Sequence, residues 1–328
     1  HTTMVITRIE WPESLAQYFD TSNSRLNARN VDMVYFYGTL PLFLTKAVGS
    51  AIGKTGYDEI HLVGRVLSAL FDLGSVLLLF FLARRLFDWR VGLVASFLLA
   101  LTALNIQGSH YFSVDTFLTF FVMLTIWFTL DVAEGKGWSA YLGLGISMGL
   151  TLSCKVSVFL LVAVVALGGW VHLRRRLAEG QRGRVVALRT LGGLVGAAIV
   201  AIVVFRITQP YAWAGPNYDG WDSVPAPWNE RLAFLQDLPK PIAAVISPNP
   251  QWIADIDSAG KQQTGEADMP WGRQWTDRTP WLFPLENMVL WGLGVPLGVA
   301  AWLGVAFFVG RLLLRWRRNR TQQPGAES

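Results

Sequence analysis

Five residues that could act on a phosphate or a hydroxyl group stand at the ends of long apolar segments: Arg65, His110, Asp115, Lys155 and Arg206. The four cations among them could together bind a phosphate or diphosphate through charge-assisted hydrogen bonds. A carboxylate beside them could take part in proton transfer. Two ordinary interpretations stay open, because a cation at a helix end can extend to lipid headgroups and Asp115 could cap the helix that follows it. The pattern makes Asp115 a candidate catalytic residue and the four cations candidate ligands of a phosphate or diphosphate at the membrane surface.

A second pattern places polar side chains along one helix face. His61, Arg65, Ser68 and Asp72 are spaced by four, three and four residues, which puts them on one stripe of an α-helix. Asp72 would lie about 10 Å further along the helix than Arg65, at 1.5 Å per residue. A carboxylate at that depth in an apolar segment must face a cavity or a partner. A structural hydrogen bond to a neighbouring helix is the alternative to a functional role.

The composition identifies the elements that must position these residues. The 328 residues are 52% hydrophobic and 16% charged, with one cysteine, whereas soluble domains carry roughly 25% charged residues. Several apolar runs approach the ~20 residues needed to cross a bilayer. A soluble domain, a disordered chain and a disulfide scaffold are therefore excluded. The sequence has no P-loop, no strand-linked GxGxxG and no HExxH motif, so ATP-driven transport and a zinc site have no support.

We expect an all-α fold, a polytopic bundle of transmembrane helices. Apolar windows predict seven spans, at residues 64–83, 91–108, 115–132, 138–154, 156–173, 190–207 and 287–311. The segment 39–53 is shorter and contains glycine, which favours an interfacial or re-entrant helix. Several spans are separated by only a few residues, which indicates tight antiparallel helical hairpins.

The Lys and Arg residues predict the orientation in the cell membrane. Fifteen of the 28 fall in four segments that alternation places on one side: 84–90, 136, 174–189 and 311–320. That side is predicted to be cytoplasmic. Residues 1–60 and 208–283 then face outward and hold 15 acidic against 10 basic residues, so we expect the active face there. The net charge of +5 is explained by topology, and no nucleic-acid partner is needed.

The expected organisation has four parts: an outer first loop with an interfacial helix at 1–63, a transmembrane core at 64–207, a Trp-rich outer loop at 208–286, and the last span with a basic tail at 287–328. Seven tryptophans occupy the second outer loop: Trp213, Trp221, Trp228, Trp252, Trp271, Trp275 and Trp281. Those near its ends fit an interfacial belt. Those inside it would suit an amphipathic ligand such as a sugar or a prenyl chain.

Four stretches carry a family resemblance: GTLPLFLTK at 38–46, RVLSALFDLGSVLLLFFLARRLF at 65–87, SHYFSVDTFLTFF at 109–121 and GLGISMGLTLSCKVSV at 143–158. In this order and spacing they resemble the GT-C superfamily of polyprenyl-phosphate-dependent glycosyltransferases. The likeness is closest to the family 39 and protein O-mannosyltransferase-like branch. It covers most of residues 30–206 and fades in 208–283.

The resemblance implies a membrane enzyme that moves a sugar from a polyprenyl-phosphate donor to a protein, lipid or glycan acceptor on the outer face, with inversion at the anomeric carbon. In the family, a carboxylate of the first outer loop is the general base. By resemblance, Asp115 corresponds to the second acid of the site, and Lys155 and Arg65 to basic positions near the lipid phosphate. His110 stands where many relatives have Arg, so its contact with phosphate would depend on its protonation near neutral pH.

The identity of the general base stays open. The chain begins at His1, and the resemblance implies that the family's first span and its Asp-Glu motif would precede that residue. The acids of the first loop are Glu10, Glu13, Asp20, Asp32, Asp58 and Glu59, and none is assigned as the base. No cofactor follows with certainty, and a divalent cation is left open. The alternative functions are a transporter or flippase of lipid-linked sugars and a non-catalytic, truncated relative.

Overall fold

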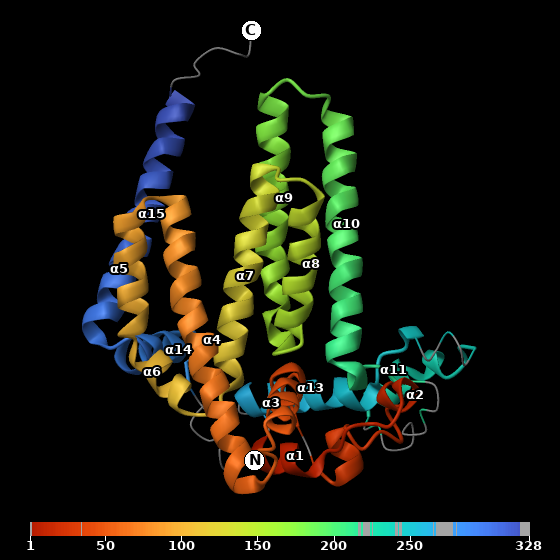
Figure 1. Ribbon diagram of the computed structural model, residues 1–328. Helices are drawn as coiled ribbons and strands as arrows, with labels where there is room; N and C mark the ends of the chain where they lie inside the picture. The colour runs from red at the N-terminus through yellow and green to blue at the C-terminus, as the bar shows by residue number, and fades with distance from the viewer. Residues whose placement is uncertain are drawn as a thin grey trace.

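The computed structural model describes residues 2–33, 35–215, 218, 224, 226–239, 242, 245–264, 266, 278–279 and 281–321. Over these residues the chain is helical and has no strands beyond an isolated bridge between Trp213 and Pro248. The tall helices of the bundle are α4 (Tyr57–Leu86), α5 (Trp89–Ala100), α7 (Val114–Glu134), α8 (Trp138–Leu152), α9 (Leu161–Ala178), α10 (Gly183–Thr208) and α15 (Val295–Thr321). In Figure 1 these helices run in roughly the same direction, which confirms the predicted helical bundle.

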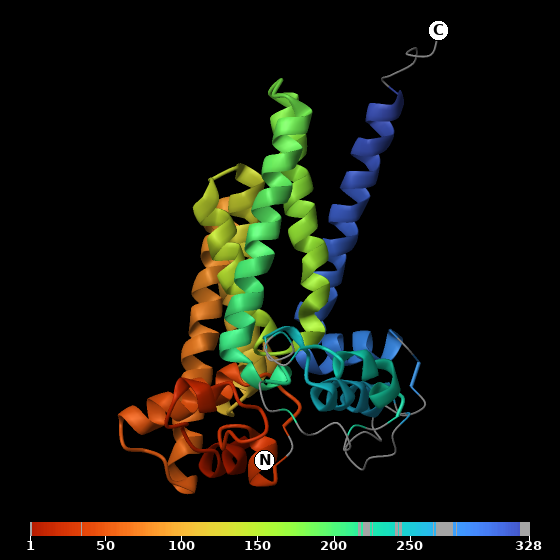
Figure 2. The ribbon, with the colours of Figure 1, turned by 90° about the vertical axis from the view of Figure 1, so that its right-hand side faces the viewer.

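Shorter helices gather at one end of the bundle, which we call the loop end. They are α1 (Thr2–Arg8), α2 (Leu15–Tyr18), η1 (Ala28–Val31), α3 (Leu40–Ala51), α6 (Ala103–His110), η3 (Pro210–Ala212), α11 (Trp228–Arg231), η5 (Ala233–Leu235), α13 (Pro250–Thr264), α14 (Leu282–Asn287) and η7 (Met288–Gly292). The 3-10 turn η2 (Val156–Leu160) leads into α9. Figures 1 and 2 show α13 running across the loop end, nearly at right angles to the tall helices.

The prediction of seven spans is wrong in its count. Among the described residues, five helices are long and apolar enough to cross a membrane: α4, α7, α10, α15, and η2 with α9. The predicted span 91–108 is instead α5 and α6, bent by 59°, and would be a sixth span only if the bent pair is counted as one. The predicted span 138–154 is α8, whose 15 residues reach only about 22 Å.

The last predicted span also begins later than expected. Residues 282–292 form α14 and a π-helical turn, and the straight helix starts only at Val295, after Gly294 with a positive φ of 80°. Hydropathy registers how apolar a segment is and does not register where the backbone leaves the helix. The short apolar helix predicted over 39–53 is α3, which carries Pro41 in its first turn.

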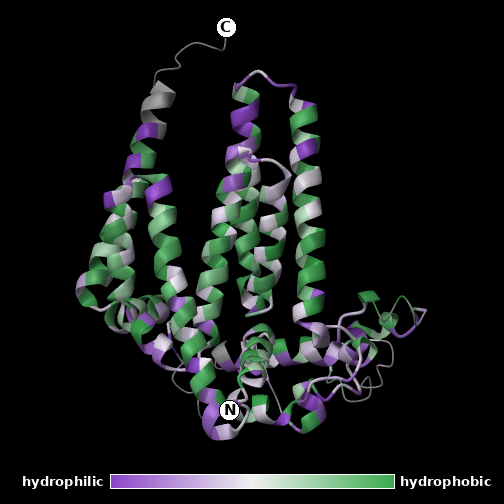
Figure 3. Cartoon of the chain, viewed as in Figure 1, coloured by the Kyte–Doolittle hydropathy of each residue, from purple (hydrophilic) through white to green (hydrophobic). Residues whose placement is uncertain are grey.

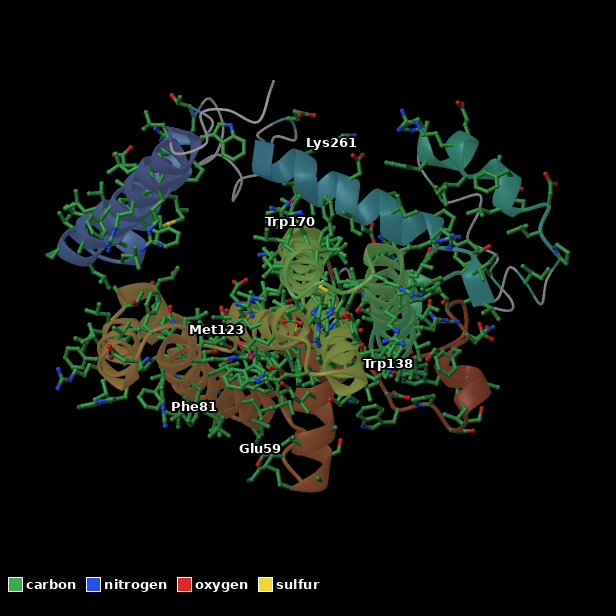
Figure 4. All side chains as sticks on the ribbon, turned by 90° about the horizontal axis from the view of Figure 1, so that it is seen from above. Glu59, Phe81, Met123, Trp138, Trp170 and Lys261 are labelled. Atoms are coloured by element: carbon green, nitrogen blue, oxygen red, sulfur yellow. The ribbon has the colours of Figure 1, made fainter. Side chains whose placement is uncertain are left out.

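Glycines allow α8 and α10 to pack closely. A Cβ atom on Gly145 would lie 2.5 Å from the carbonyl oxygen of Ala197, and one on Gly149 would lie 2.7 Å from that of Ala201. Small residues at such crossings let two backbones approach within a membrane. On the neighbouring face, the buried hydroxyls of Thr125 and Thr151 are 3.1 Å apart and join α7 to α8. Figure 4 shows α7 to α10 as one group, with α15 standing apart from them.

The segments rich in Lys and Arg all lie at the end of the bundle opposite the loop end. In Figure 1 this end carries the α4–α5 turn, the α7–α8 turn, the α9–α10 loop and the C-terminal end of α15, and Figure 3 shows hydrophilic residues there above largely apolar helices. Arg85 of α4 bridges to Asp131 at 2.6 Å and to Glu134 at 2.7 Å, both on α7. Lys136 adds a 2.8 Å bridge to Asp131. This ion cluster joins α4 and α7 at that end.

The first segment folds against the loop end around a small apolar core. Val5, Ile6 and Ile9 from the first helix region pack with Leu26 and Leu42, all nearly inaccessible to solvent. Tyr211, which follows α10, joins this core, and its hydroxyl lies 2.8 Å from that of Ser24. The first segment and the segment after α10 are therefore packed together, although about 190 residues separate them.

We predict that Gly149→Ala lowers the thermal stability of the detergent-solubilised protein. The added methyl group would press on the backbone of α10, and overpacking of this kind costs about 1–3 kcal/mol. Gly196→Ala on α10 is the matched control, because a Cβ there meets nothing within 4 Å. Equal melting temperatures for the two variants would contradict the close α8–α10 packing.

Candidate functional site

Asp115 stands in the first turn of α7, at the loop end of the bundle. The helix is capped by Ser113, whose hydroxyl accepts a hydrogen bond from the Asp115 backbone N–H at 3.2 Å. The alternative that Asp115 itself is the cap is therefore wrong. Its carboxylate Oδ1 lies 3.3 Å from Nζ of Lys155, and the side chain is 66% exposed. The carboxylate is thus paired with one cation and open to a ligand.

Lys155 lies in the bend between α8 and η2, and the first segment holds that bend in place. Its Nζ sits 5.8 Å from the centre of the Tyr37 ring, a cation–π contact. Gly38, which follows Tyr37 in the chain, donates its N–H to the carbonyl of Cys154 at 2.9 Å. A Cβ on Gly38 would lie 1.9 Å from the carbonyl oxygen of Ser153, so only glycine fits here. The first segment therefore docks on the bend and covers Lys155 with Tyr37.

The polar stripe of α4 holds the turn that leads to Asp115. Arg65 donates from Nε to the backbone carbonyl of His110 at 2.6 Å. The Ser68 hydroxyl accepts from the Ser113 N–H at 3.1 Å. Asp72 accepts from the Asn105 side chain at 3.0 Å, which agrees with the structural alternative stated for it. Arg65, Ser68 and Asp72 thus hydrogen-bond residues 105–113 at three successive positions along α4.

His61, the first member of the stripe, does not reach that turn by any described hydrogen bond. Its Nδ1 lies 3.3 Å from the Tyr57 carbonyl on its own helix. His110 is likewise turned to its own backbone, with Nδ1 2.6 Å from the Ile106 carbonyl. In the contacts described, the imidazole of His110 caps the end of α6, and its Nε2 remains for other partners.

Arg206, near the end of α10, is surrounded by aromatic rings. Its guanidinium lies 4.9 Å from the Phe19 ring centre and 5.6 Å from that of Trp213, and it donates to the Pro210 carbonyl at 2.8 Å. Burial raises the pKa of the neighbouring Tyr18 to about 12, and the positive charge of Arg206 offsets part of this increase. The contacts thus place Arg65 with His110, Lys155 with Asp115, and Arg206 in an aromatic setting of its own.

Two aromatic residues of the site escaped the sequence analysis. Tyr35 and Tyr37 contact each other edge to face, with ring centres 5.8 Å apart, and Tyr37 covers Lys155. The signal that could have found them is the run Tyr35-Phe36-Tyr37-Gly38, an aromatic cluster ending in a glycine just before the interfacial helix. Tyrosine side chains combine a large apolar contact area with a polar hydroxyl, which suits them to ligand contact.

The tryptophans of the second outer loop are dispersed. Trp252 on α13 contacts Phe205 with ring centres 6.1 Å apart, Trp228 contacts Arg231, and Trp281 is 89% exposed. Trp221, Trp271 and Trp275 lie outside the described residues.

Three of the six acids of the first segment form local contacts: Glu10 with Arg25, Glu59 with Lys54, and Asp20 within its own turn. In the described part of the chain, no group of three or more His, Cys, Asp or Glu residues could hold a metal ion.

Comparison with known proteins gave one family match. Residues 57–206 match the family of dolichyl-phosphate-mannose-protein mannosyltransferases. The match supports a GT-C glycosyltransferase. The predicted resemblance is confirmed over α4 to α10, the segment that holds Arg65, His110, Asp115, Lys155 and Arg206. No curated protein and no solved structure matched the chain. The matched segment is less than half of the chain, and it is similar to a family of membrane glycosyltransferases that use lipid-linked sugar donors.

The arrangement of the candidate site can do two things chemically. An ammonium group beside an exposed carboxylate can neutralise a phosphate while the carboxylate accepts a hydrogen bond from a hydroxyl. The geometry also makes the site depend on Gly38, because the ring that covers Lys155 belongs to the adjacent residue.

We predict that Gly38→Ala detaches the first segment from the 153–155 bend. The methyl group would overlap the Ser153 carbonyl, so the segment must move. Limited proteolysis should then cut residues 1–40 faster than in the wild type. Gly56→Ala is the control in the same segment, since its nearest contact would be an ordinary 3.5 Å. Unchanged cleavage of Gly38→Ala would contradict the docking.

Proposed function

We propose that the chain transfers a sugar, with inversion, from a polyprenyl-phosphate donor to a hydroxyl of an acceptor outside the cytoplasm. The observation that carries the proposal is the Asp115–Lys155 pair, 3.3 Å apart and exposed, at the loop end of the segment that matches the family. Asp115 belongs to α7 and Lys155 to the bend after α8, and they meet where the first segment docks. The donor class follows the family match, whereas inversion and the outer acceptor follow from the resemblance.

In this proposal Lys155 neutralises the leaving phosphate. The acceptor oxygen forms a bond to the anomeric carbon as the bond from that carbon to the phosphate oxygen breaks. Negative charge then develops on the polyprenyl phosphate, and a fixed ammonium group stabilises it. Asp115 keeps Lys155 in place with Oδ1 and offers Oδ2 to the acceptor hydroxyl. The proton of that hydroxyl passes to the general base of the site, a carboxylate role that none of the described acids is assigned.

Arg65 and His110 act beside this pair. Because the guanidinium of Arg65 bonds the His110 carbonyl through Nε, its two terminal NH₂ groups are available for a phosphate. Arg206, which is flanked by the rings of Phe19 and Trp213, would supply a further positive charge. A divalent cation could join Lys155 in binding the phosphate, so the transfer assay is run with and without Mg²⁺.

We predict that Asp115→Asn and Lys155→Ala each reduce sugar transfer by about 100-fold, the scale seen when one acid–base or charge-stabilising group is lost. The assay uses labelled dolichyl-phosphate mannose with protein in nanodiscs and counts the glycosylated product. Folding should persist, since exposed ion pairs contribute little stability.

The matched controls are Glu59→Gln and Lys54→Ala. These residues form an ion pair of similar exposure at the same end of the bundle, 2.6 Å apart. Both should transfer at the wild-type rate. Near-normal turnover by the Asp115 and Lys155 variants would overturn the site assignment, and movement of intact donor across the bilayer without product would favour the flippase alternative.

The proposed orientation has its own test by thiol labelling. Cys154, the single cysteine, is buried, so it contributes little background. We expect a membrane-impermeant maleimide to label Thr55→Cys in intact cells and Gln181→Cys only after permeabilisation. The reverse pattern would place the Asp115 end in the cytoplasm and contradict the outer acceptor.

A further inference from the structure

A polar pocket lies between the first segment and α13, next to the candidate site. Its lining includes Arg29, Tyr35, Tyr37, Gln209, Trp252 and Asp255. These residues come from three separate parts of the chain, the first segment, the end of α10 and α13. None of them was assigned a role by the sequence except Trp252, as one of the loop tryptophans.

Two polar groups of this pocket have no hydrogen bond of normal geometry in the described part of the protein. The Tyr35 hydroxyl is buried and forms no hydrogen bond at normal geometry. Gln209 uses its carbonyl oxygen to accept from the N–H and hydroxyl of Thr39, which leaves its NH₂ group without a described partner. A buried polar group without a partner costs stability, so its presence in a pocket is best explained by a ligand that completes its hydrogen bonds.

The charges of the pocket balance. Arg29 faces Asp255 through two parallel contacts, one of them 3.1 Å between Nε and Oδ2. A guanidinium already matched to a carboxylate has little attraction left for a phosphate, whereas the pair presents both donors and acceptors to neutral hydroxyl groups. The indole of Trp252 and the ring of Tyr37 add flat apolar surfaces. Hydroxyl-bonding groups beside aromatic faces suit a neutral sugar.

The pocket reaches the candidate site through Tyr37. This ring lines the pocket and also covers Nζ of Lys155, which pairs with Asp115. The open space in the pocket is about 40 Å³, enough for a few hydroxyl groups and too small for a whole sugar ring. A ligand would therefore insert one edge and leave the rest of its ring over Tyr37, toward Asp115.

We infer that this pocket binds one hydroxyl-bearing edge of a neutral sugar ring and so positions that ring at the Asp115–Lys155 pair. The inference rests on the proposed glycosyl transfer for the role of the bound sugar. The sugar is either the glycosyl unit of the donor or a sugar of a glycan acceptor, and both present the same chemistry to the pocket.

The test is a binding measurement on Tyr35→Phe, which removes only the unpaired hydroxyl. The full chain in nanodiscs is titrated with methyl glycosides of mannose, glucose and galactose, with dolichyl-phosphate mannose, and with dolichyl phosphate. We expect affinity for the sugar-bearing probe to fall about tenfold, the effect of one lost hydrogen bond. The melting temperature should change little, because the hydroxyl forms no hydrogen bond of normal geometry in the described part of the protein. Tyr57→Phe, an exposed tyrosine at the start of α4, is the control and should bind as the wild type does.

The outcomes separate the two sources of the sugar. Weaker binding of dolichyl-phosphate mannose, with unchanged binding of dolichyl phosphate, identifies the donor sugar. Weaker binding of a methyl glycoside alone identifies the acceptor. The inference is overturned if Tyr35→Phe binds every probe as the wild type does, or if the wild type binds no sugar-bearing probe.

The binding measurement and the transfer assay can fail independently, so failure of the pocket can be told from failure of the proposed function. If the wild type transfers sugar and Tyr35→Phe binds every probe normally, the proposed function stands and the sugar-binding role of the pocket is excluded. If the wild type binds a glycoside through Tyr35 but transfers no sugar, the sugar-binding role of the pocket stands and the proposed function is excluded.

Discussion

The contact on which the site depends is the approach of Gly38 to the bend at Ser153 and Cys154. A backbone N–H of the first segment bonds a carbonyl left free where α8 ends, and the missing side chain of glycine permits the distance. The next contacts follow from this one. Tyr37 lies over Lys155, and Thr39 bonds the end of α10 through Thr208 and Gln209. Three chain segments far apart in sequence are thereby fixed around one cation.

A second constraint acts from inside the bundle. Polar groups within an apolar helix need partners, because no water is present to satisfy them. In α4 those partners belong to the turn before α7, so the stripe at Arg65, Ser68 and Asp72 sets the height and direction of Asp115. Residues that resemble catalytic groups in the sequence therefore serve in part as supports. Arg65 can do both, since the bond to His110 uses only its Nε.

The sequence predicted those parts of the fold that depend on local pattern. The helices α4, α7 and α10 were predictable because their apolar runs are long and uninterrupted, and Asp115 and Lys155 stood out as charges at helix ends. The break between α5 and α6 was not predictable in this way, since Leu101 and Thr102 are as apolar or as small as residues inside helices. The pairing of Asp115 with Lys155 joins residues 40 positions apart, and the fit of Gly38 on Ser153 joins residues still further apart. Contacts of that range depend on how helices pack, which periodicity and composition do not encode.

The exposure of the Asp115–Lys155 pair argues for function over stability. The Asp115 side chain is 66% exposed and that of Lys155 32%, and ion pairs at such positions typically contribute about 0–1 kcal/mol. The ion cluster around Arg85 differs, because Arg85 and Asp131 are only 13% and 11% exposed and join two long helices. In the proposed function, a lipid-linked sugar would cover the open pair and displace water. The effective dielectric would then fall, and each charge would act more strongly on the phosphate and on the attacking hydroxyl. A pair that does little for the folded protein on its own would thus become effective when substrate is bound.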